Sequence, residues 1–231
     1  ARRAGLHGEP TLMILHSIHV GSELFSGELP RLVEAAEGYL RGARARNNTW
    51  GLAWPLALLG YVRLFQGDEE RGKAALNEAL ALTPEVPMTL SRVHVETFAV
   101  SAYLFDGKPE EGLAALEDLK KRCEDSGLVT TSLEASTYRL MRARLILLTA
   151  VQKTGWRPEK ETCRLGLTLR RLLPATSSTR EEMLRLEAAS ALRNGQPRRG
   201  LEFVERAIYL AELRANRFGL GMLLIARAAF R

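Results

Sequence analysis

The sequence contains little cysteine and no long apolar run, and each shortage argues against a class of protein. Its 231 residues include two cysteines, Cys123 and Cys163, without C-x-x-C spacing or a disulfide framework. Reduced thiols in a cytoplasmic protein are the simple interpretation. Apolar runs such as residues 218–226 are about half as long as a bilayer span requires. No segment resembles a signal peptide, so we expect a cytoplasmic protein without a membrane partner.

Motifs for catalysis and cofactor binding are also lacking. We find no Ser-His-Asp arrangement, no metalloprotease helix and no Gly-rich dinucleotide turn. His16 and His19 share a helical face and could hold a metal, with His94 or Glu23 as a third ligand, but such histidines are usually structural. Cations beside Cys123 could lower the pKa of its thiol, although a solvated helix end is the simpler interpretation. We expect no enzyme activity, no cofactor and no metal.

One stretch resembles a nucleotide site. Gly67, Gly72 and Lys73 form G-x-x-x-x-G-K within "LFQGDEERGKAAL". A phosphate-binding loop needs a preceding strand, and a Ser or Thr after the lysine to hold magnesium. Here the preceding segment has helical periodicity, and Ala74 follows the lysine. We therefore interpret this stretch as one copy of a structural repeat.

The repeat has a period near 40 residues. "LFSG", "LFQG" and "LFDG" recur at that interval, and "DEERGKAAL" matches "KPEEGLAAL" after two of them. Helical periodicity flanks each glycine, which suits a turn because glycine accepts a positive φ where a helix ends. The expected turn glycines are Gly27, Gly67, Gly107, Gly155 and Gly195, spaced 40, 40, 48 and 40 residues apart.

Prolines and capping residues predict where helices begin. Pro55 implies either that its helix starts near Trp54 or that this helix is kinked. Ser178 and Glu181 have the spacing of a capping box. Four further prolines follow turn glycines at first-turn positions, where a missing N–H costs nothing: Pro30, Pro109, Pro158 and Pro197.

These signals predict an all-α protein, a single domain over residues 1–231. We expect a right-handed α-α solenoid of about five helix-turn-helix units plus an unpaired C-terminal helix. The first residue is Ala1 and "ARRAG" reads as the tail of a helix, so we expect a piece of a longer protein. The expected units cover about residues 10–46, 49–83, 86–125, 128–173 and 178–216, with the extra helix at 218–231.

The pattern resembles the tetratricopeptide repeat. Val100 departs from it where a small residue is usual, and the units exceed the usual 34 residues. This longer period, with the "ARARNNTWGLAW" junction, is similar to arrays in bacterial regulators attached to STAND ATPases, Ser/Thr kinases or cyclases. A HEAT-like solenoid is the alternative. The second unit carries the resemblance through Leu59, Gly60, Gly67, Gly72, Ala79 and Pro84.

The resemblance implies a non-catalytic protein–protein interaction module, the regulatory or sensing arm of a larger cytoplasmic signalling protein. Its partner would be a protein, a peptide or another domain of the same chain, held in a groove lined by the first helices. Reversing the charge of Arg185 and Arg193 is expected to weaken partner binding without unfolding. The groove candidates are Trp54, Tyr61, His94, Ser101, Arg142, Thr149, Arg185 and Arg193.

Three other functions stay open. The unpaired last helix would expose apolar surface and could drive homodimerisation, which would make the chain a structural module. Some similar arrays in regulators bind small ligands. Residues 151–231 carry 16 Lys+Arg against 8 Asp+Glu, which favours an acidic neighbour. Nucleic acid is the less favoured partner, because the basic region has few aromatics and no recognition motif.

Overall fold

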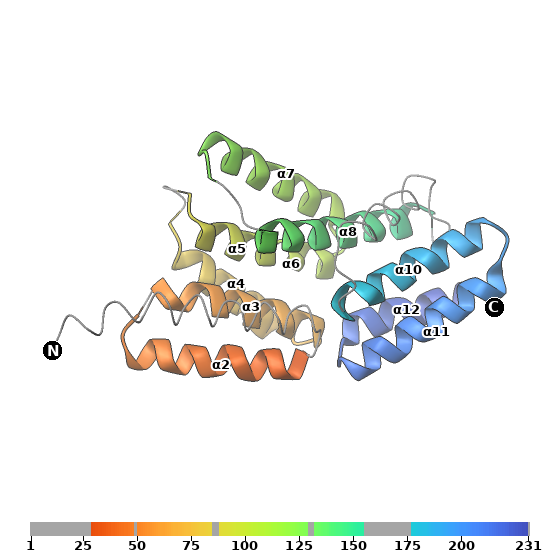
Figure 1. The fold of residues 1–231 in the computed structure, drawn as a ribbon, viewed down its shortest axis with the longest axis horizontal. Coiled ribbons are helices and arrows are strands. Elements are labelled where there is room, and N and C mark those ends of the chain that lie inside the picture. Colours follow the sequence, from red (N-terminus) through yellow and green to blue (C-terminus); the bar gives the residue numbers. More distant parts are fainter. Residues whose placement is uncertain (1–28, 49, 85–87, 129–131, 155–176, 231) are drawn as a thin grey trace.

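Every regular element that the structure describes is helical (Figure 1). The structure is a computed structural model and describes residues 29–48, 50–84, 88–128, 132–154 and 177–230. The all-α prediction is therefore confirmed for these ranges. The expected first helix of unit one, the second helix of unit four, and Pro158, Cys163, His16, His19 and Glu23 lie outside them.

The described helices can be placed within the predicted unit ranges. Units two, three and five each consist of a first helix and a second helix on either side of a short turn. The elements are α2 (Leu29–Ala45), the 3-10 helix η1 (Trp50–Leu52), α3 (Ala53–Phe65), α4 (Glu69–Ala81), α5 (Leu90–Ala99), α6 (Ser101–Phe105), α7 (Pro109–Asp125), α8 (Ser132–Thr154), α10 (Ser177–Arg193), α11 (Pro197–Leu213) and α12 (Arg217–Ala229).

Three of the five predicted turn glycines lie in the described ranges and adopt the left-handed conformation, whereas Gly27 and Gly155 lie outside these ranges. Gly67, Gly107 and Gly195 have φ values of 85°, 67° and 69°. The residue after each glycine donates its backbone N–H to the carbonyl five positions earlier, at 2.9 Å in all three turns. This is the bonding of a Schellman motif, which satisfies carbonyls left over at a helix end. These turn predictions are confirmed.

The links that precede α3, α8 and α12 close in the same way. The left-handed residues of these three links are Asn47, Gly127 and Ala215, respectively, with φ values of 52°, 67° and 53°. Asn48, Leu128 and Asn216 then donate to carbonyls five positions earlier, at 3.0, 3.1 and 2.9 Å. Ala215 is unusual among these residues, because its Cβ is strained in this region.

Substituting glycine for Ala215 tests that strain. Ala215→Gly is expected to raise the free energy of unfolding by about 1 kcal/mol, since it removes the left-handed penalty at a small cost in chain entropy. The measurement is urea denaturation followed by circular dichroism. Gly67→Ala is the matched reverse change and should destabilise by a similar amount. Destabilisation by Ala215→Gly would contradict the assigned turn.

The prolines lie in first turns, as expected. Pro109 and Pro197 are the first residues of α7 and α11, and Pro30 is the second residue of α2. Helix α3 begins at Ala53, so Pro55 occupies its first turn, and the alternative of a kinked helix is wrong. Helix α10 begins at Ser177, so Ser178 lies inside its first turn and does not mark the helix start as the predicted Ser178–Glu181 capping box requires. The Glu181 carboxylate accepts hydrogen bonds from Arg214 and Asn216.

The first helix of the third unit is divided at Val100, where α5 ends and α6 follows after one residue. Two side chains in this region return to the backbone of their own helix. Thr97 Oγ1 donates to the Val93 carbonyl at 2.7 Å, and Ser101 Oγ donates to the Phe98 carbonyl at 2.5 Å. Such bonds compete with the helical ladder and bend helices, which accounts for the break.

Helix α3 is central to the first group of helices and packs against α2, α4 and α5. Its contact with α4 is closest at Gly60 and Gly72. A Cβ on Gly60 would lie 2.7 Å from the Gly72 carbonyl oxygen, and one on Gly72 would lie 2.8 Å from Leu64 Cγ. Glycine at both positions therefore allows the two backbones to approach.

A second apolar core joins α10, α11 and α12. Its members include Leu184, Val204, Ile208 and Leu223, all buried. The larger core holds residues of α2 to α8, with Phe98, Leu58 and Leu116 among its fully buried side chains. The two groups lie side by side in Figure 1, and α12 contacts α3 while α10 contacts α8.

Candidate functional site

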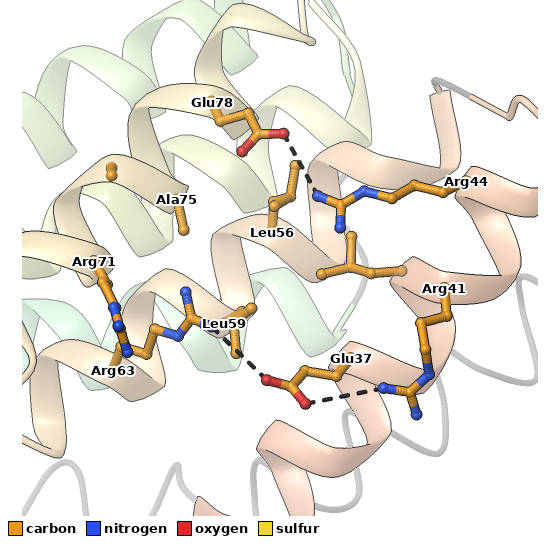
Figure 2. Close-up of a pocket in the computed structure, with 11 residues that line it drawn as sticks. Glu37, Arg41, Arg44, Leu56, Leu59, Arg63, Arg71, Ala75 and Glu78 are labelled. Atoms are coloured by element: carbon orange, nitrogen blue, oxygen red, sulfur yellow. Dashed lines mark ion pairs between the residues drawn. The ribbon is translucent and has the colours of Figure 1, made fainter.

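A pocket of about 390 Å³ lies between α2, α3 and α4. Its floor is apolar, because Leu40, Leu56, Leu59 and Ala75 are each at most 5% exposed and face this space. Figure 2 shows charged side chains from all three helices around this floor. We call this the arginine pocket; its charged members are Glu37, Arg41, Arg44, Arg63, Arg71 and Glu78.

The ion pairs across the arginine pocket are long. Arg63 and Arg41 lie 3.7 and 4.0 Å from the carboxylate of Glu37, and Arg44 lies 3.9 Å from Glu78 (Figure 2). These distances exceed hydrogen-bond length, so attraction here is coulombic and is weakened by solvent. Among the described lining residues, four arginines face two glutamates, which is a formal surplus of two positive charges. Arg71 also lies 3.7 Å from Asp68, which is not a lining residue.

A second pocket, of about 490 Å³, lies between α4, α5, α6 and α7 at the equivalent place in the next unit. Many lining residues of the two pockets correspond after a shift of 40 residues. The corresponding pairs are Glu37/Asn77, Leu40/Leu80, Leu56/Glu96, Leu59/Ala99, Arg63/Tyr103, Ala75/Ala115 and Glu78/Asp118. The same surface feature therefore recurs with different chemistry.

The second pocket is neutral and its charges are closely paired. Its lining contains Lys73, Arg92 and Arg122 against Glu96, Asp106 and Asp118. Lys73 Nζ lies 2.5 Å from Asp106 Oδ1, and Arg122 Nε lies 2.8 Å from Asp118 Oδ2. The Glu96 carboxylate accepts hydrogen bonds from both Arg92 and Arg122. These contacts link three helices of consecutive units and serve the structure of the chain.

Glu96 makes this network sensitive to acid. Burial acts to raise the pKa of its carboxyl, but hydrogen bonds from Arg122 and Arg92 outweigh burial and hold the pKa below its usual value. Because the pKa of Glu96 is lower in the folded state than in the unfolded state, ionised Glu96 stabilises the folded state at pH values above the unfolded pKa, near 4.5. This stability is lost as the pH falls through the folded-state pKa.

We therefore expect the free energy of unfolding to decline as pH falls below about 4.5, with part of the decline due to Glu96. Urea titrations at several pH values measure it. Glu96→Gln should destabilise most at neutral pH, and its difference from the wild type should shrink on acidification. Glu202→Gln, at an exposed position on α11, is the control and should leave the pH profile unchanged. A constant difference at every pH would contradict the assignment.

The structure brings several of the predicted groove residues together on α3 and α5. The rings of Trp54 and His94 meet edge to face, with centroids 6.2 Å apart. Tyr61 packs against Phe98 and accepts a hydrogen bond from Arg144 on α8. The Trp54 and His94 side chains are half-buried, whereas Tyr61 is only 3% exposed. Tyr61 therefore serves packing between first helices in this structure.

Ser101 and Arg185 are also interior. Ser101 is fully buried and donates to its own helix, and Arg185 is 5% exposed on α10. Reversing the charge at Arg185 would place a carboxylate in the core, so we expect this change to destabilise the fold as well. Arg185 is buried because of its position on the helix: Glu181 and Arg185 are one turn apart, so they lie on the same face of α10, and both face inward.

The remaining predicted residues are accessible but separate. Arg142 is half-exposed on α8 and lies 3.3 Å from Glu117 on α7. Thr149 donates to the Leu145 carbonyl of the same helix at 2.9 Å. Arg193 is exposed at the last residue of α10. The structure does not gather these three side chains with Trp54 and His94 into one site.

Two sequence hypotheses concerned Lys73 and Cys123. Lys73 lies in α4, where its ammonium binds Glu69 and Asp106, and the residues before Gly67 form a helix instead of a strand. Cys123 is buried, and burial raises the pKa of its thiol against the opposing effect of Arg122. Both sequence interpretations, a lowered pKa for this thiol and a solvated helix end, are therefore wrong.

The arginine pocket itself was missed by sequence reasoning, which looked for basic residues in the C-terminal third. A signal was present, since Glu37, Arg41 and Arg44 are spaced for one helical face. The contributions of Arg63 and Arg71 depend on how α3 and α4 cross, which requires the structure.

Comparisons of the chain with family models, with curated proteins and with solved structures give no match. Within the described ranges, no helix has both the length and the apolar character needed to cross a bilayer. No group of three or more His, Cys, Asp or Glu side chains in this part of the chain is arranged to hold a metal ion.

Proposed function

We propose that the chain is a non-catalytic binding module that docks a protein or peptide. Its helix pairs would form a right-handed α-α solenoid of tetratricopeptide-like units, in which each unit offers a surface for a partner. The observation that carries the proposal is the recurrence of one pocket between successive units, with lining chemistry that changes from unit to unit. Repetition of a concave feature with varied side chains suits recognition of an extended ligand.

The role of such a module is regulatory or sensing, as one arm of a larger cytoplasmic signalling protein. Binding would shift the population of states of an output domain, and no chemistry is required of this chain. The resemblance to arrays in bacterial regulators motivates this role. The closely paired charges of the second pocket support it in part, because they couple neighbouring units through Arg92, Glu96 and Arg122.

Affinity capture tests the proposal. The chain is immobilised and exposed to native lysate, with and without nuclease, at low and high salt. A discrete protein that survives nuclease, and that free chain competes away, supports docking. Capture of nucleic acid alone, lost at high salt, would overturn the proposal in favour of a basic surface. Capture of nothing would contradict docking in trans.

Self-association is the second candidate, favoured by exposed apolar side chains on the last helices. Tyr209 and Leu213, one turn apart on α11, are 65% and 68% exposed, and Ile225 on α12 is 60% exposed. A second copy could bury these side chains in an isologous contact. Sedimentation equilibrium measures the oligomeric state. If the chain self-associates through this surface, the wild type should be a dimer and the double variant Leu213→Asp with Ile225→Asp should be a monomer. A monomeric wild type would contradict this candidate.

A further inference from the structure

We propose that the arginine pocket binds an acidic peptide through one apolar side chain flanked by carboxylates. This deepens the proposed binding function and rests on it. Three properties of the pocket carry the inference: an apolar floor, a surplus of positive charge at the rim, and ion pairs too long to engage the guanidinium groups closely.

The floor defines the centre of the ligand. Leu40, Leu56 and Leu59 converge from α2 and α3, and Ala75 contributes from α4. Small residues at 74 and 75 leave space above the leucines, which accounts for part of the volume of about 390 Å³. A pocket of this size with an apolar base gains affinity by removing an aliphatic or aromatic side chain from water.

The rim defines what flanks that side chain. Arg44 and Arg63 stand on different helices across the floor, and each is held 3.7 to 3.9 Å from a glutamate. Guanidinium groups bind carboxylates through paired hydrogen bonds, so incoming carboxylates would make shorter contacts than Glu37 and Glu78 make. The formal surplus of two positive charges matches a ligand with two acidic groups.

A comparison with the second pocket shows why an acidic ligand fits the arginine pocket and not its equivalent in the next unit. Leu56 corresponds to Glu96 and Arg63 to Tyr103, so the second pocket has a carboxylate in place of an apolar floor residue. That carboxylate binds Arg92 and Arg122, and the second pocket is neutral. Of these two equivalent pockets, the first has charge to offer to an acidic ligand.

The lining disfavours nucleic acid. Recognition of single-stranded nucleic acid usually combines phosphate contacts with bases stacked on aromatic rings. Among the residues that the structure describes, those that line the arginine pocket include no aromatic side chain. A leucine-rich floor suits a peptide side chain better than a stacked base.

Fluorescence anisotropy tests the proposal with labelled peptides that carry a central leucine between Asp-Asp pairs. We expect saturable binding that weakens at high salt and drops when the leucine becomes alanine or the aspartates become asparagines. Inorganic phosphate and a single-stranded oligonucleotide serve as competitors. Competition by the oligonucleotide and not by unlabelled peptide would overturn the proposal, as would absence of saturation up to about 1 mM peptide.

Variants that should weaken peptide binding and a variant that should strengthen it make the test specific. Arg44→Gln with Arg63→Gln should weaken peptide binding by about tenfold. Glu78→Gln removes a competing carboxylate and should strengthen it by about threefold. Arg206→Gln, at an exposed position on α11 outside both pockets, is the matched control and should change nothing. Equal affinities for all four proteins would overturn the assignment, and circular dichroism verifies that each is folded.

These results separate the pocket from the general function. If partner capture succeeds and is unaffected by Arg44→Gln with Arg63→Gln, the chain is a binding module but the arginine pocket is not its site. If the peptide binds as expected and lysate yields no partner, the pocket assignment stands and docking in trans fails.

Discussion

Replacing Gly60 with alanine is expected to destabilise the protein by about 2 kcal/mol or more, although alanine is the better helix former. The added Cβ would lie 2.7 Å from the backbone oxygen of Gly72 and 2.7 Å from Leu76 Cγ. A flexible side chain could move away from such a contact, but a backbone oxygen in a neighbouring helix cannot. Helices α3 and α4 must therefore separate, which loosens the core around Leu64 and Leu76.

Urea denaturation of Gly60→Ala measures this effect, and two further variants calibrate it. Gly38 and Gly221 are exposed glycines within α2 and α12, where an added Cβ meets no atom closer than 3.8 Å. Gly38→Ala and Gly221→Ala should each stabilise by about 1 kcal/mol through helix propensity. The same substitution thus has opposite signs at packed and open positions. A stabilising Gly60→Ala would show that α3 and α4 do not approach as described.

Removing the Glu181 carboxylate is expected to cost about 3 to 5 kcal/mol, because it takes away a buried ion-pair partner of Arg214 and the acceptor of hydrogen bonds from Arg214 and Asn216. Glu181 and Arg214 are 1% and 5% exposed, and their charged groups lie 3.2 Å apart. The same carboxylate accepts from Asn216 Nδ2 at 3.0 Å, and Asn216 Oδ1 caps α12 by accepting from the Gly219 N–H at 2.8 Å. One carboxylate therefore positions the turn between α11 and α12 and the start of α12.

Glu181→Ala, Arg214→Ala and the double variant form the test, measured by denaturation and by hydrogen exchange in α10 to α12. The double variant should be less destabilised than the sum of the single ones, since each single variant already loses the interaction between the two residues. Glu205→Ala is the control: Glu205 pairs with Arg227 at 3.8 Å on the surface and should contribute less than about 1 kcal/mol. Additive costs would show that Glu181 and Arg214 do not act together.

Turns were the most predictable feature of the fold. Gly67, Gly107 and Gly195 were located by self-similarity alone, and each adopts the positive φ that glycine tolerates. Local chemistry decides these positions, because a Schellman turn is closed by backbone atoms within six residues of each other. Pro109 and Pro197 were equally legible, since proline tolerates few positions other than the first turn.

The interior polar residues could not be assigned from sequence. Arg185 and Glu181 are spaced like surface charges, and their burial follows from the position of α11 and α12 against α10. The break at Val100 depends on side-chain bonds of Thr97 and Ser101 that compete with the helix, and propensity does not order such competitors.

Part of the arginine pocket could be predicted from the sequence, and part required the structure. Single-helix spacing on α2 could have drawn attention to Glu37, Arg41 and Arg44. The apolar floor could not be inferred, because Leu56 and Leu59 have the periodicity of ordinary core residues. Only the crossing of α2, α3 and α4 shows that these leucines line an accessible pocket.

The shared turn geometry also bears on how a chain like this can change its length. Each turn is closed by its own backbone bonds and needs nothing from distant residues. A duplication of residues 67–106 would therefore begin at the left-handed Gly67 and end directly before the equivalent Gly107, and the added segment would carry its own stop and start signals. Growth by gene duplication would add a further pocket with each copy. The lining residues of that pocket could then change without disturbing the neighbouring helix pairs.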